Sequence, residues 1–282
     1  MALFNDIYLN LRAFLRFFKF LFVIGAYFIS AVRAWTSTAD PDERRRRLIE
    51  NGHQSAKRIL RAFNVELICK QNISEDECSL LVGNHIGFID IVCLVALRPA
   101  VFITSLEMKN TPVLGQITDL GGCAYVDRKS RMSIQDELKD IVKVLKQGFR
   151  VVLYAESVAS NGEQVLPFKK TLMTAAGLSG KPIRPFVFNF VKVNGGPVLY
   201  EHRDSVCWYG DQQFHEAIWR SLKLDSLVCE IEFLPLVEVA PDVDRTKLAH
   251  QVHHMVAAKY VPFKPDMNLE SQIVATPKAD AI

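Results

Sequence analysis

The sequence predicts an α/β fold, in which a mixed central sheet is flanked by helices and follows an N-terminal helical module that associates with a membrane. From residue 65 onward, short apolar runs typical of strands alternate with amphipathic stretches typical of helices. Before residue 63 the chain is first apolar and aromatic, then basic. The length of 282 residues suits one large domain or a domain with an appendage.

The apolar segment reads LRAFLRFFKFLFVIGAYFISAVRAW, and seven of the 18 Phe residues fall in the first 28 positions. Its uncharged core, Phe20 to Val32, is shorter than the roughly 20 residues of a membrane span, and no cleavage site indicates a signal peptide. A buried core helix is one interpretation. The flanking residues favour a monotopic or re-entrant anchor, with Arg and Lys at the lipid headgroups and Phe and Trp35 below them.

Charge is divided unevenly along the chain. Residues 1–62 carry eleven basic and five acidic side chains, a net +6, which leaves −3 for the remainder of a chain whose total is +3. Basic residues on both sides of the apolar segment indicate the cytoplasmic face of the inner or cell membrane. Arg44 to Arg47 form either a solvated helix face or a headgroup contact. We expect no nucleic-acid partner, because the aromatic residues form an apolar block and do not alternate with the charges.

Residues that favour helix caps and turns indicate where the predicted helices and strands begin and end. Residues 37–65 predict a basic helix with Pro41 near its start and acids in its first turn. Ser133 and Gly148 bound the clearest helix, whose apolar stripe is Ile134, Leu138, Ile141, Val142 and Leu145. Further strands are expected at 65–70, 79–84, 100–105, 149–157, 182–191 and 227–239, and further helices at 89–97, 169–180, 211–224 and 244–261.

Two segments are less regular. Pro185 predicts that the strand over 182–191 lies at a sheet edge or a bulge, because proline donates no ladder hydrogen bond. Residues 195–210 suggest one more strand or a hairpin, entered through a turn at VNGGP. The expected organisation is a membrane anchor over 1–62, an α/β domain over 63–262 and a loose tail over 263–282.

We expect neither disulfides nor a metal. The six cysteines are scattered without a CxxC pair, which is typical of reduced thiols. His250, His253 and His254 have helical spacing, but no carboxylate or cysteine shares their face, so a polar helix surface is the simpler interpretation. Trp208 and Trp219 are expected to pack or to lie at an interface.

The stretch LVGNHIGFIDIV, residues 81–92, opens an apolar region to polar side chains. His85 follows a strand and Asp90 falls at the start of the next helix, where α/β proteins usually keep their chemistry. Gly87 frees the backbone between them. An Asp that accepts from one ring nitrogen fixes the tautomer and leaves the other nitrogen to take a proton from a hydroxyl. The pair is therefore a candidate general base with its orienting carboxylate.

Four ordered blocks between residues 78 and 190 resemble the glycerolipid acyltransferase family, the lysophosphatidic-acid-like enzymes. NHIGFID is similar to the family's NHxSxxD block, with Gly87 where serine is common. GGCAYVDR resembles the segment that ends in Asp127 and Arg128, and KPIRPFVF resembles the fourth block. The stretch LEMKNTPVLGQI contains the family's recurring Glu107, Pro112 and Gly115.

The third block departs from the family. It usually reads FPEGTR, and this chain reads LYAESVASNG. Glu156 keeps the glutamate position, but Ser157, Val158 and Ala159 stand where Gly, Thr and Arg are expected. The chain therefore lacks the arginine associated with gripping phosphate. Family members that use other acceptors share this loss and continue with a run like SNGEQVLPFK.

The resemblance implies a membrane-associated acyltransferase that moves a fatty acyl group from acyl carrier protein or coenzyme A to a lysophospholipid hydroxyl, without a cofactor. His85 takes the hydroxyl proton, Asp90 orients His85, and backbone N–H groups around Gly87 hold the oxyanion. No GxSxG motif is present, so we expect direct transfer without an acyl-enzyme. Substrate contacts are expected from Gly87, Arg128, Glu156, Ser157 and Lys169.

Three alternatives stay open. Because of Ala159, the acceptor is either a lysophosphatidic-acid-like lipid or another lyso-lipid, such as an acylated amino-acid lipid or a lysophospholipid with a headgroup. A lipid hydrolase would use His85 to activate water. An inactive lipid-binding protein would keep the fold alone, although the intact His-Asp pair argues against it. A hydrophobic tunnel is expected to set the acyl-chain length.

Overall fold

The computed structural model describes residues 2–127 and 134–264. Within these residues a seven-stranded sheet forms the centre, in the order β1-β7-β6-β2-β5-β3-β4. β6, β2, β5, β3 and β4 run parallel, whereas β7, with β1 beside it, runs antiparallel to β6, so the predicted mixed sheet is confirmed. The strands are β1 (Val65–Lys70), β2 (Leu80–Gly83), β3 (Val101–Ser105), β4 (Ala124–Val126), β5 (Val151–Tyr154), β6 (Ile183–Val193) and β7 (Leu227–Phe233).

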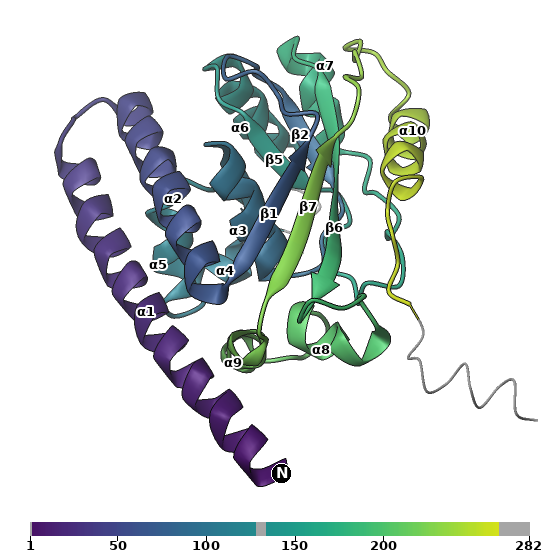
Figure 1. Cartoon of the computed structure of the whole chain (residues 1–282). Helices are drawn as coiled ribbons and strands as arrows, with labels where there is room; N and C mark the ends of the chain where they lie inside the picture. The colour runs from purple at the N-terminus through teal and green to yellow at the C-terminus, as the bar shows by residue number, and fades with distance from the viewer. Residues whose placement is uncertain (1, 128–133, 265–282) are drawn as a thin grey trace, which may run out of the picture.

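Helices cover both faces of the sheet (Figure 1). α2, α3 and α9 bury side chains in a core on one face, and α6, α7 and α10 bury theirs in a second core on the other. The helices are α1 (Ala2–Thr36), α2 (Pro41–Phe63), α3 (Phe88–Leu97), α4 (Leu106–Lys109), α5 (Leu114–Asp119), α6 (Ile134–Lys146), α7 (Ala175–Ser179), α8 (Arg203–Val206), α9 (Phe214–Lys223) and α10 (Arg245–Ala257). Two 3₁₀ turns are η1 (Leu172–Thr174) and η2 (Tyr200–His202).

The central strands read as continuous apolar runs because both of their faces are covered. Along β2, Leu80 and Val82 enter one core while Leu81 enters the other. β5 behaves in the same way and is buried at all four of its residues. These strands place their carboxyl ends side by side, which is where the next loops carry His85 and Glu156.

α1 is one unbroken helix of 35 residues. The stretch Asp6–Thr36 is long and apolar enough to cross a membrane, and only 11% of its most apolar window is buried. The re-entrant loop does not match the structure, because this helix does not turn back. A helix buried in the core does not match it either, because α1 adds only Ala13 to a core cluster and leaves many of its apolar side chains exposed. Its exposed apolar side chains are Ile7, Tyr8, Leu11, Phe14, Leu15, Phe18, Leu21, Phe22, Ile29, Val32 and Trp35.

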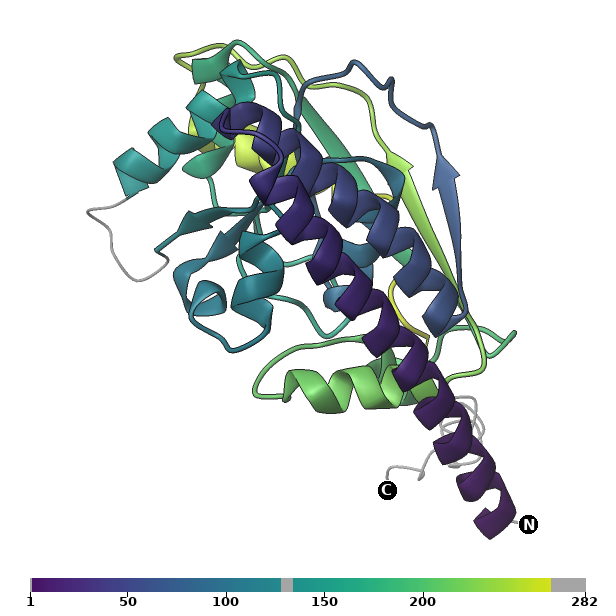
Figure 2. The same ribbon diagram turned by 90° about the vertical axis from the view of Figure 1, so that its left-hand side faces the viewer.

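The opposite side of α1 packs against α2 and α9, and its N-terminal end projects beyond them (Figure 2). Near the N-terminal half, the Phe17 ring meets Trp219 of α9 at 6.2 Å, and Arg12 pairs with Asp225 at 2.6 Å. Further along, the Ser30 hydroxyl lies 2.6 Å from Asn51 Oδ1 of α2. α1 therefore has one protein-facing side and one unpartnered apolar side.

α2 has the caps that its sequence predicts. Asp40 accepts from the Asp42 N–H at 2.9 Å, and Asn64 ends the helix in the left-handed region at φ 55°. The helix buries apolar side chains, among them Leu60 and Phe63, against the sheet. The predicted boundary at residue 62 stays a prediction, and this packing ties α2 to the α/β domain.

The four arginines at the start of α2 make contacts within the chain. Arg44 lies over the Trp35 ring at 4.8 Å, and Arg46 lies over the Phe149 ring at 4.7 Å. Arg47 pairs with Glu43 at 2.8 Å. These contacts join α1, α2 and the loop before β5, a role that neither sequence interpretation included.

Two expectations about strands were wrong. Pro185 lies in β6, an interior strand between β7 and β2. β7 ends at Phe233 where it would otherwise pair with Pro185, and the Pro185 carbonyl accepts from the Leu234 N–H at 2.8 Å, so the missing proline donor faces a gap in the ladder. The turn at VNGGP is present, but residues 200–206 then form η2 and α8 in place of a strand.

Candidate active site

The register of β2 and β5 builds the site. Gly83, the last residue of β2, pairs with Tyr154, the last residue of β5, so the chain leaves both strands at the same level. A Cβ on Gly83 would lie 2.5 Å from the Phe186 ring and carbonyl, and the neighbouring strand therefore requires glycine here. His85 follows the first of these strands and Glu156 follows the second.

His85 and Asp90 form the expected pair. His85 Nδ1 lies 3.1 Å from both carboxylate oxygens of Asp90. Asp90 is 1% exposed, whereas the His85 side chain is partly exposed to a cavity. Because a buried carboxylate only accepts, Nδ1 carries the hydrogen and Nε2 is left with its lone pair. The predicted geometry for a general base and its orienting group is present.

Asp90 also satisfies the start of α3. Its Oδ2 accepts from the Ile86 N–H at 2.6 Å and from the Gly87 N–H at 2.9 Å. The sequence analysis expected backbone N–H groups around Gly87 to hold the oxyanion, and for these two groups the structure contradicts it. Asp90 stands at the third position of the helix, where a carboxylate caps the free N–H groups, so the donors turn toward it and away from the cavity.

Close packing explains why position 87 is a glycine. Its backbone is extended, and a Cβ built on it would lie 2.8 Å from the Trp208 nitrogen. The Trp208 N–H in turn donates to the Ile86 carbonyl at 3.1 Å. The segment at 207–208 therefore lies directly on the loop that holds His85, and the small residue permits this contact.

Glu156 connects the loop after β2 with the loop after β5. Its carboxylate accepts from the His85 N–H at 2.8 Å and from the Leu166 N–H at 2.9 Å. Burial raises the pKa of Glu156 to about 8, although the two backbone hydrogen bonds act in the opposite direction. Both oxygens accept from backbone donors, so Glu156 orders the His85 loop, and its predicted contact with the substrate stays a prediction.

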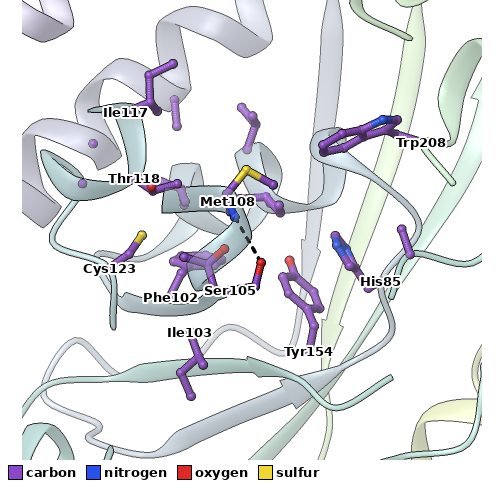
Figure 3. Close-up of a pocket in the computed structure, with 18 of the residues that line it drawn as sticks. His85, Phe102, Ile103, Ser105, Met108, Ile117, Thr118, Cys123, Tyr154 and Trp208 are labelled. Carbon is purple, nitrogen blue, oxygen red and sulfur yellow. Dashed lines mark hydrogen bonds between the residues drawn. The ribbon is translucent and has the colours of Figure 1, made fainter. Parts of the chain in front are cut away.

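Tyr154 and Trp208 complete the surroundings of His85 (Figure 3). The Tyr154 ring stacks on the imidazole with centroids 4.2 Å apart and 20° between the planes. Burial, and then the charge of Asp90, raise the pKa of the Tyr154 hydroxyl above its ordinary value, so it stays protonated. Neither residue was predicted to belong to the site. Their partners lie about 70 and 120 positions away in the sequence, and no spacing signal connects them.

A cavity of about 690 Å³ leads away from His85. Its walls are mainly apolar and come from α1, α2, α3, β3 and α5. Tyr27 of α1 closes part of the wall, where its hydroxyl donates to the Ile117 carbonyl at 2.8 Å. The volume suits a ligand of lipid size. The sequence analysis expected a hydrophobic tunnel, and that this cavity sets the acyl-chain length stays a prediction.

The remaining predicted residues are placed less centrally. Ser157 has φ 66° and closes the turn after β5, where its N–H donates to the Tyr154 carbonyl at 3.0 Å. Val158 and Ala159 line the cavity. The Lys169 N–H closes the same loop on the Ala155 carbonyl at 2.7 Å, but its side chain is exposed and lies outside the cavity wall. Arg128 lies outside the described residues, directly after Asp127.

No three His, Cys, Asp or Glu side chains are placed to hold a metal ion within the part of the chain that the structure describes. His253 meets the Val165 carbonyl at 3.2 Å and stacks edge-on against Phe168, so it packs α10 onto the domain. The six cysteines are free.

Comparison with known proteins shows that the chain is similar to acyltransferases. The acyltransferase family model matches residues 64–189. A 1-acyl-sn-glycerol-3-phosphate acyltransferase of Neisseria meningitidis is 26% identical over 77% of this chain and 82% of its own. A lyso-ornithine lipid O-acyltransferase of Brucella abortus is 29% identical over 76% of this chain and 82% of its own. Over residues 64–189 the chain matches the acyltransferase family, and its relatives include glycerolipid and ornithine-lipid acyltransferases.

The fold of this acyltransferase also agrees with a solved structure. The crystal structure of the 1-acyl-sn-glycerophosphate (LPA) acyltransferase PlsC from Thermotoga maritima matches 99% of this chain and all of its own, with a TM-score of 0.64 and 16% identity. The expected family, mixed α/β fold and acyl transfer to a hydroxyl are confirmed. Both relatives are named for lyso-lipid acceptors, 1-acylglycerol-3-phosphate in one and lyso-ornithine lipid in the other.

Proposed function

We propose that this acyltransferase moves a fatty acyl group from a coenzyme A or acyl carrier protein thioester to the free hydroxyl of a lysophospholipid of the 1-acylglycerol-3-phosphate class. One observation carries the proposal. The His85–Asp90 pair, at 3.1 Å, faces an apolar cavity of about 690 Å³, so a proton acceptor and an acyl-binding space meet at one place.

The reaction is a direct transfer. His85 Nε2 takes the proton of the acceptor hydroxyl while that oxygen attacks the thioester carbonyl carbon. The carbon–sulfur bond then breaks, and the thiolate leaves with the proton returned from His85. Asp90 stabilises the imidazolium that forms between these steps. Atoms and charge balance without a cofactor.

One observation favours a second acceptor class. Ala159 lines the cavity where the family pattern has an arginine, and no Lys or Arg lines it within the described residues. A phosphate monoester headgroup normally meets such cations. A lyso-lipid with another headgroup, such as an acylated amino-acid lipid, is the second candidate, and the Brucella relative is named for such an acceptor.

The reaction takes place at the membrane surface. The exposed apolar side of α1 supports membrane association, and the cavity wall includes Ile24 and Tyr27 of the same helix. An acceptor lipid therefore reaches the cavity from the surface on which α1 rests. We assign this surface to the cytoplasmic face, where acyl thioesters are carried and where flanking basic residues favour retention.

An acceptor panel tests the proposal. Detergent-purified protein is incubated with labelled acyl-CoA or acyl carrier protein and with 1-acylglycerol-3-phosphate, lysophosphatidylcholine or lyso-ornithine lipid. We expect labelled diacyl product with one of them and a loss of about 10²–10⁴-fold in His85→Ala. His215→Ala, an exposed histidine on α9, is the matched control and should keep full activity.

Two outcomes oppose the proposal. Substantial activity in His85→Ala would remove the general-base assignment. Free fatty acid released at the same rate with and without an acceptor would indicate water as the acceptor and a hydrolase in place of a transferase.

A further inference from the structure

The Tyr154 hydroxyl is a buried polar group that the proposed mechanism does not use. Tyr154 is 8% exposed, and its ring stacks on His85. Within the described part of the chain its hydroxyl makes no hydrogen bond of full geometry, and Asp90 is the side chain that acts on it as a hydrogen-bond acceptor. A buried hydroxyl without a full hydrogen bond is unfavourable, so its retention beside the reacting pair calls for a physical role.

The groups around Tyr154 identify the acceptor that this hydroxyl serves. Phe102 of β3 and Phe186 of β6 pack against its ring at 6.3 and 6.0 Å and offer no polar atom from their side chains. From α3, Asp90 and Cys93 face it, and Asp90 is the charged one of the two. Burial and the Asp90 carboxylate keep the pKa of Tyr154 above its ordinary value, so the group is a neutral donor.

Asp90 has capacity for one more hydrogen bond. Its Oδ2 already accepts from the Ile86 and Gly87 N–H groups and from His85. Its Oδ1 accepts from His85 Nδ1 at 3.1 Å, which leaves a lone pair on that oxygen. The donor without a full hydrogen bond and the acceptor with a free lone pair thus belong to two residues that both contact the same imidazole.

We propose that Tyr154 is a positioning residue for the pair: its ring fixes the plane of His85, and its hydroxyl donates to Asp90 and so limits how strongly the carboxylate holds a proton on the imidazole. This inference rests on the proposed role of His85 and Asp90. A phenylalanine stands at this position in the family pattern FPEGTR, and a phenylalanine has the same ring without the hydroxyl. The ring therefore serves the reaction itself, and the hydroxyl sets its working pH range.

The test is the pH profile of kcat/KM between pH 5 and 9 for Tyr154→Phe and Tyr154→Leu. Without the hydroxyl, Asp90 keeps more of its charge and holds the proton on His85 to higher pH. In Tyr154→Phe the acid limb should move up by about 0.5 to 1 pH unit, with kcat on the plateau within about tenfold of the wild type. Tyr154→Leu also loses the ring, and its plateau should fall at least about tenfold below that of Tyr154→Phe.

Two further groups are controlled in this design. Glu156, which accepts from the His85 N–H, also titrates in this range but is unchanged in each variant, so the difference between profiles isolates Tyr154. Tyr125→Phe removes a hydroxyl that bonds Thr118 at 2.9 Å, away from the pair, and should leave the limb in place.

The possible failures are distinguishable. A Tyr154→Phe profile that overlays the wild type, while His85→Ala is inactive, would overturn this inference and leave the proposed function standing. An active His85→Ala would instead remove the proposed function on which the inference rests. A lower melting temperature in Tyr154→Phe with no change of the limb would indicate a purely structural tyrosine and would also overturn it.

Discussion

At the residue scale, Asp90 does two things with one carboxylate. It caps the first N–H groups of α3 and it accepts from His85 Nδ1. These roles are linked because the cap fixes the carboxylate that in turn fixes the ring. His85 and Asp90, five residues apart, therefore form one structural unit with the start of α3.

Asp90→Asn tests this link. A side-chain amide has one acceptor oxygen and an NH2 group that only donates, so a buried N–H of Ile86, Gly87 or His85 must lose its acceptor. We expect kcat to fall by about 10²–10⁴-fold and the free energy of unfolding to fall by about 1–3 kcal/mol. His85→Ala should lower kcat as much but stability less, because it leaves the cap intact. An Asp90→Asn protein with wild-type kcat and melting temperature would contradict the arrangement.

Gly87→Ser puts the family's usual residue into this loop. The added Cβ would meet the Trp208 nitrogen at 2.8 Å, so the segment at 207–208 must move. We expect a loss of about 1–3 kcal/mol in the free energy of unfolding, measured by chemical denaturation. Gly25→Ala on α1 has nothing within 4 Å and should be neutral. Equal stability of both variants would show that the close approach costs nothing.

The sequence predicted His85 and Asp90 because their chemistry lies within one local unit. It did not predict Tyr154 or Trp208, which reach His85 through strand pairing and through a loop far along the chain. It assigned Glu156 to the site for its residue type, and the structure gives the reason: two backbone donors. The prediction that N–H groups around Gly87 hold the oxyanion was wrong for Ile86 and Gly87, because both groups already donate to Asp90.

At the element scale, β5 and the loop after it depend on Glu156. Its pKa of about 8 lies above the ordinary 4.5, so the folded state binds this proton more tightly than the unfolded state. The contribution of this group to stability is therefore full below about pH 4.5 and is lost as the pH rises through 8.

Glu156→Gln isolates that contribution. The amide leaves one backbone donor unpaired, so at pH 5 the variant should be less stable than the wild type by about 1–3 kcal/mol. Its stability does not respond to ionisation at this position, so the gap should narrow between pH 5 and 8.5. Glu238→Gln, at an exposed site, should stay parallel to the wild type. A gap that widens with pH would mean that Glu156 is ionised in the folded protein.

Elements with a strong local signal were predicted well. α2 and α6 have periodic apolar faces and clear end signals, and the apolar runs of β2 and β5 fit their burial on both faces. The prediction that Pro185 lies at a sheet edge was wrong. Proline is excluded from interior strands because it lacks an N–H donor, and in β6 this missing donor lies where β7 has already ended. Residues 200–206 are helical although their composition suited a strand, and their packing against α9 decides the outcome.

At the scale of the whole molecule, the sheet order and the path of α1 are not contained in any local pattern. The sequence gives no register between β2 and β5, which lie about 70 positions apart, and yet this pairing brings the site together. The same holds for α1. Its composition predicts contact with lipid, but only its packing partners decide how the helix is oriented.

Those partners indicate that α1 lies along the membrane surface. α1 contacts α9 through Phe17 in its N-terminal half and α2 through Ser30 in its C-terminal half. A spanning orientation would draw both partner helices into the bilayer, and α2 carries Arg44 to Arg47 together with Lys57, Arg58 and Arg61. Burying such charges in hydrocarbon is strongly unfavourable. We therefore predict that α1 rests with its apolar side in one leaflet.

Substitution of the exposed face tests this orientation. Phe18→Asp with Phe22→Asp puts two charges on the side away from the protein, where these rings are 53% and 79% exposed. We expect binding to phosphatidylcholine–phosphatidylglycerol vesicles, measured by co-flotation, to weaken by at least about tenfold with no loss of fold. Leu178→Asp, an exposed leucine on α7, should bind like the wild type.

Labelling separates lying along the membrane from crossing it. Cysteines introduced at Asn10 and at Thr36, near the two ends of α1, should both react with an impermeant maleimide added outside sealed vesicles, above the background of the native cysteines. A helix that crosses the bilayer would protect one of the two. Because α1 also lines the cavity through Tyr27, the double Phe variant should lose activity on vesicle-borne acceptor while keeping it in detergent, which would locate the acceptor's entry at this surface.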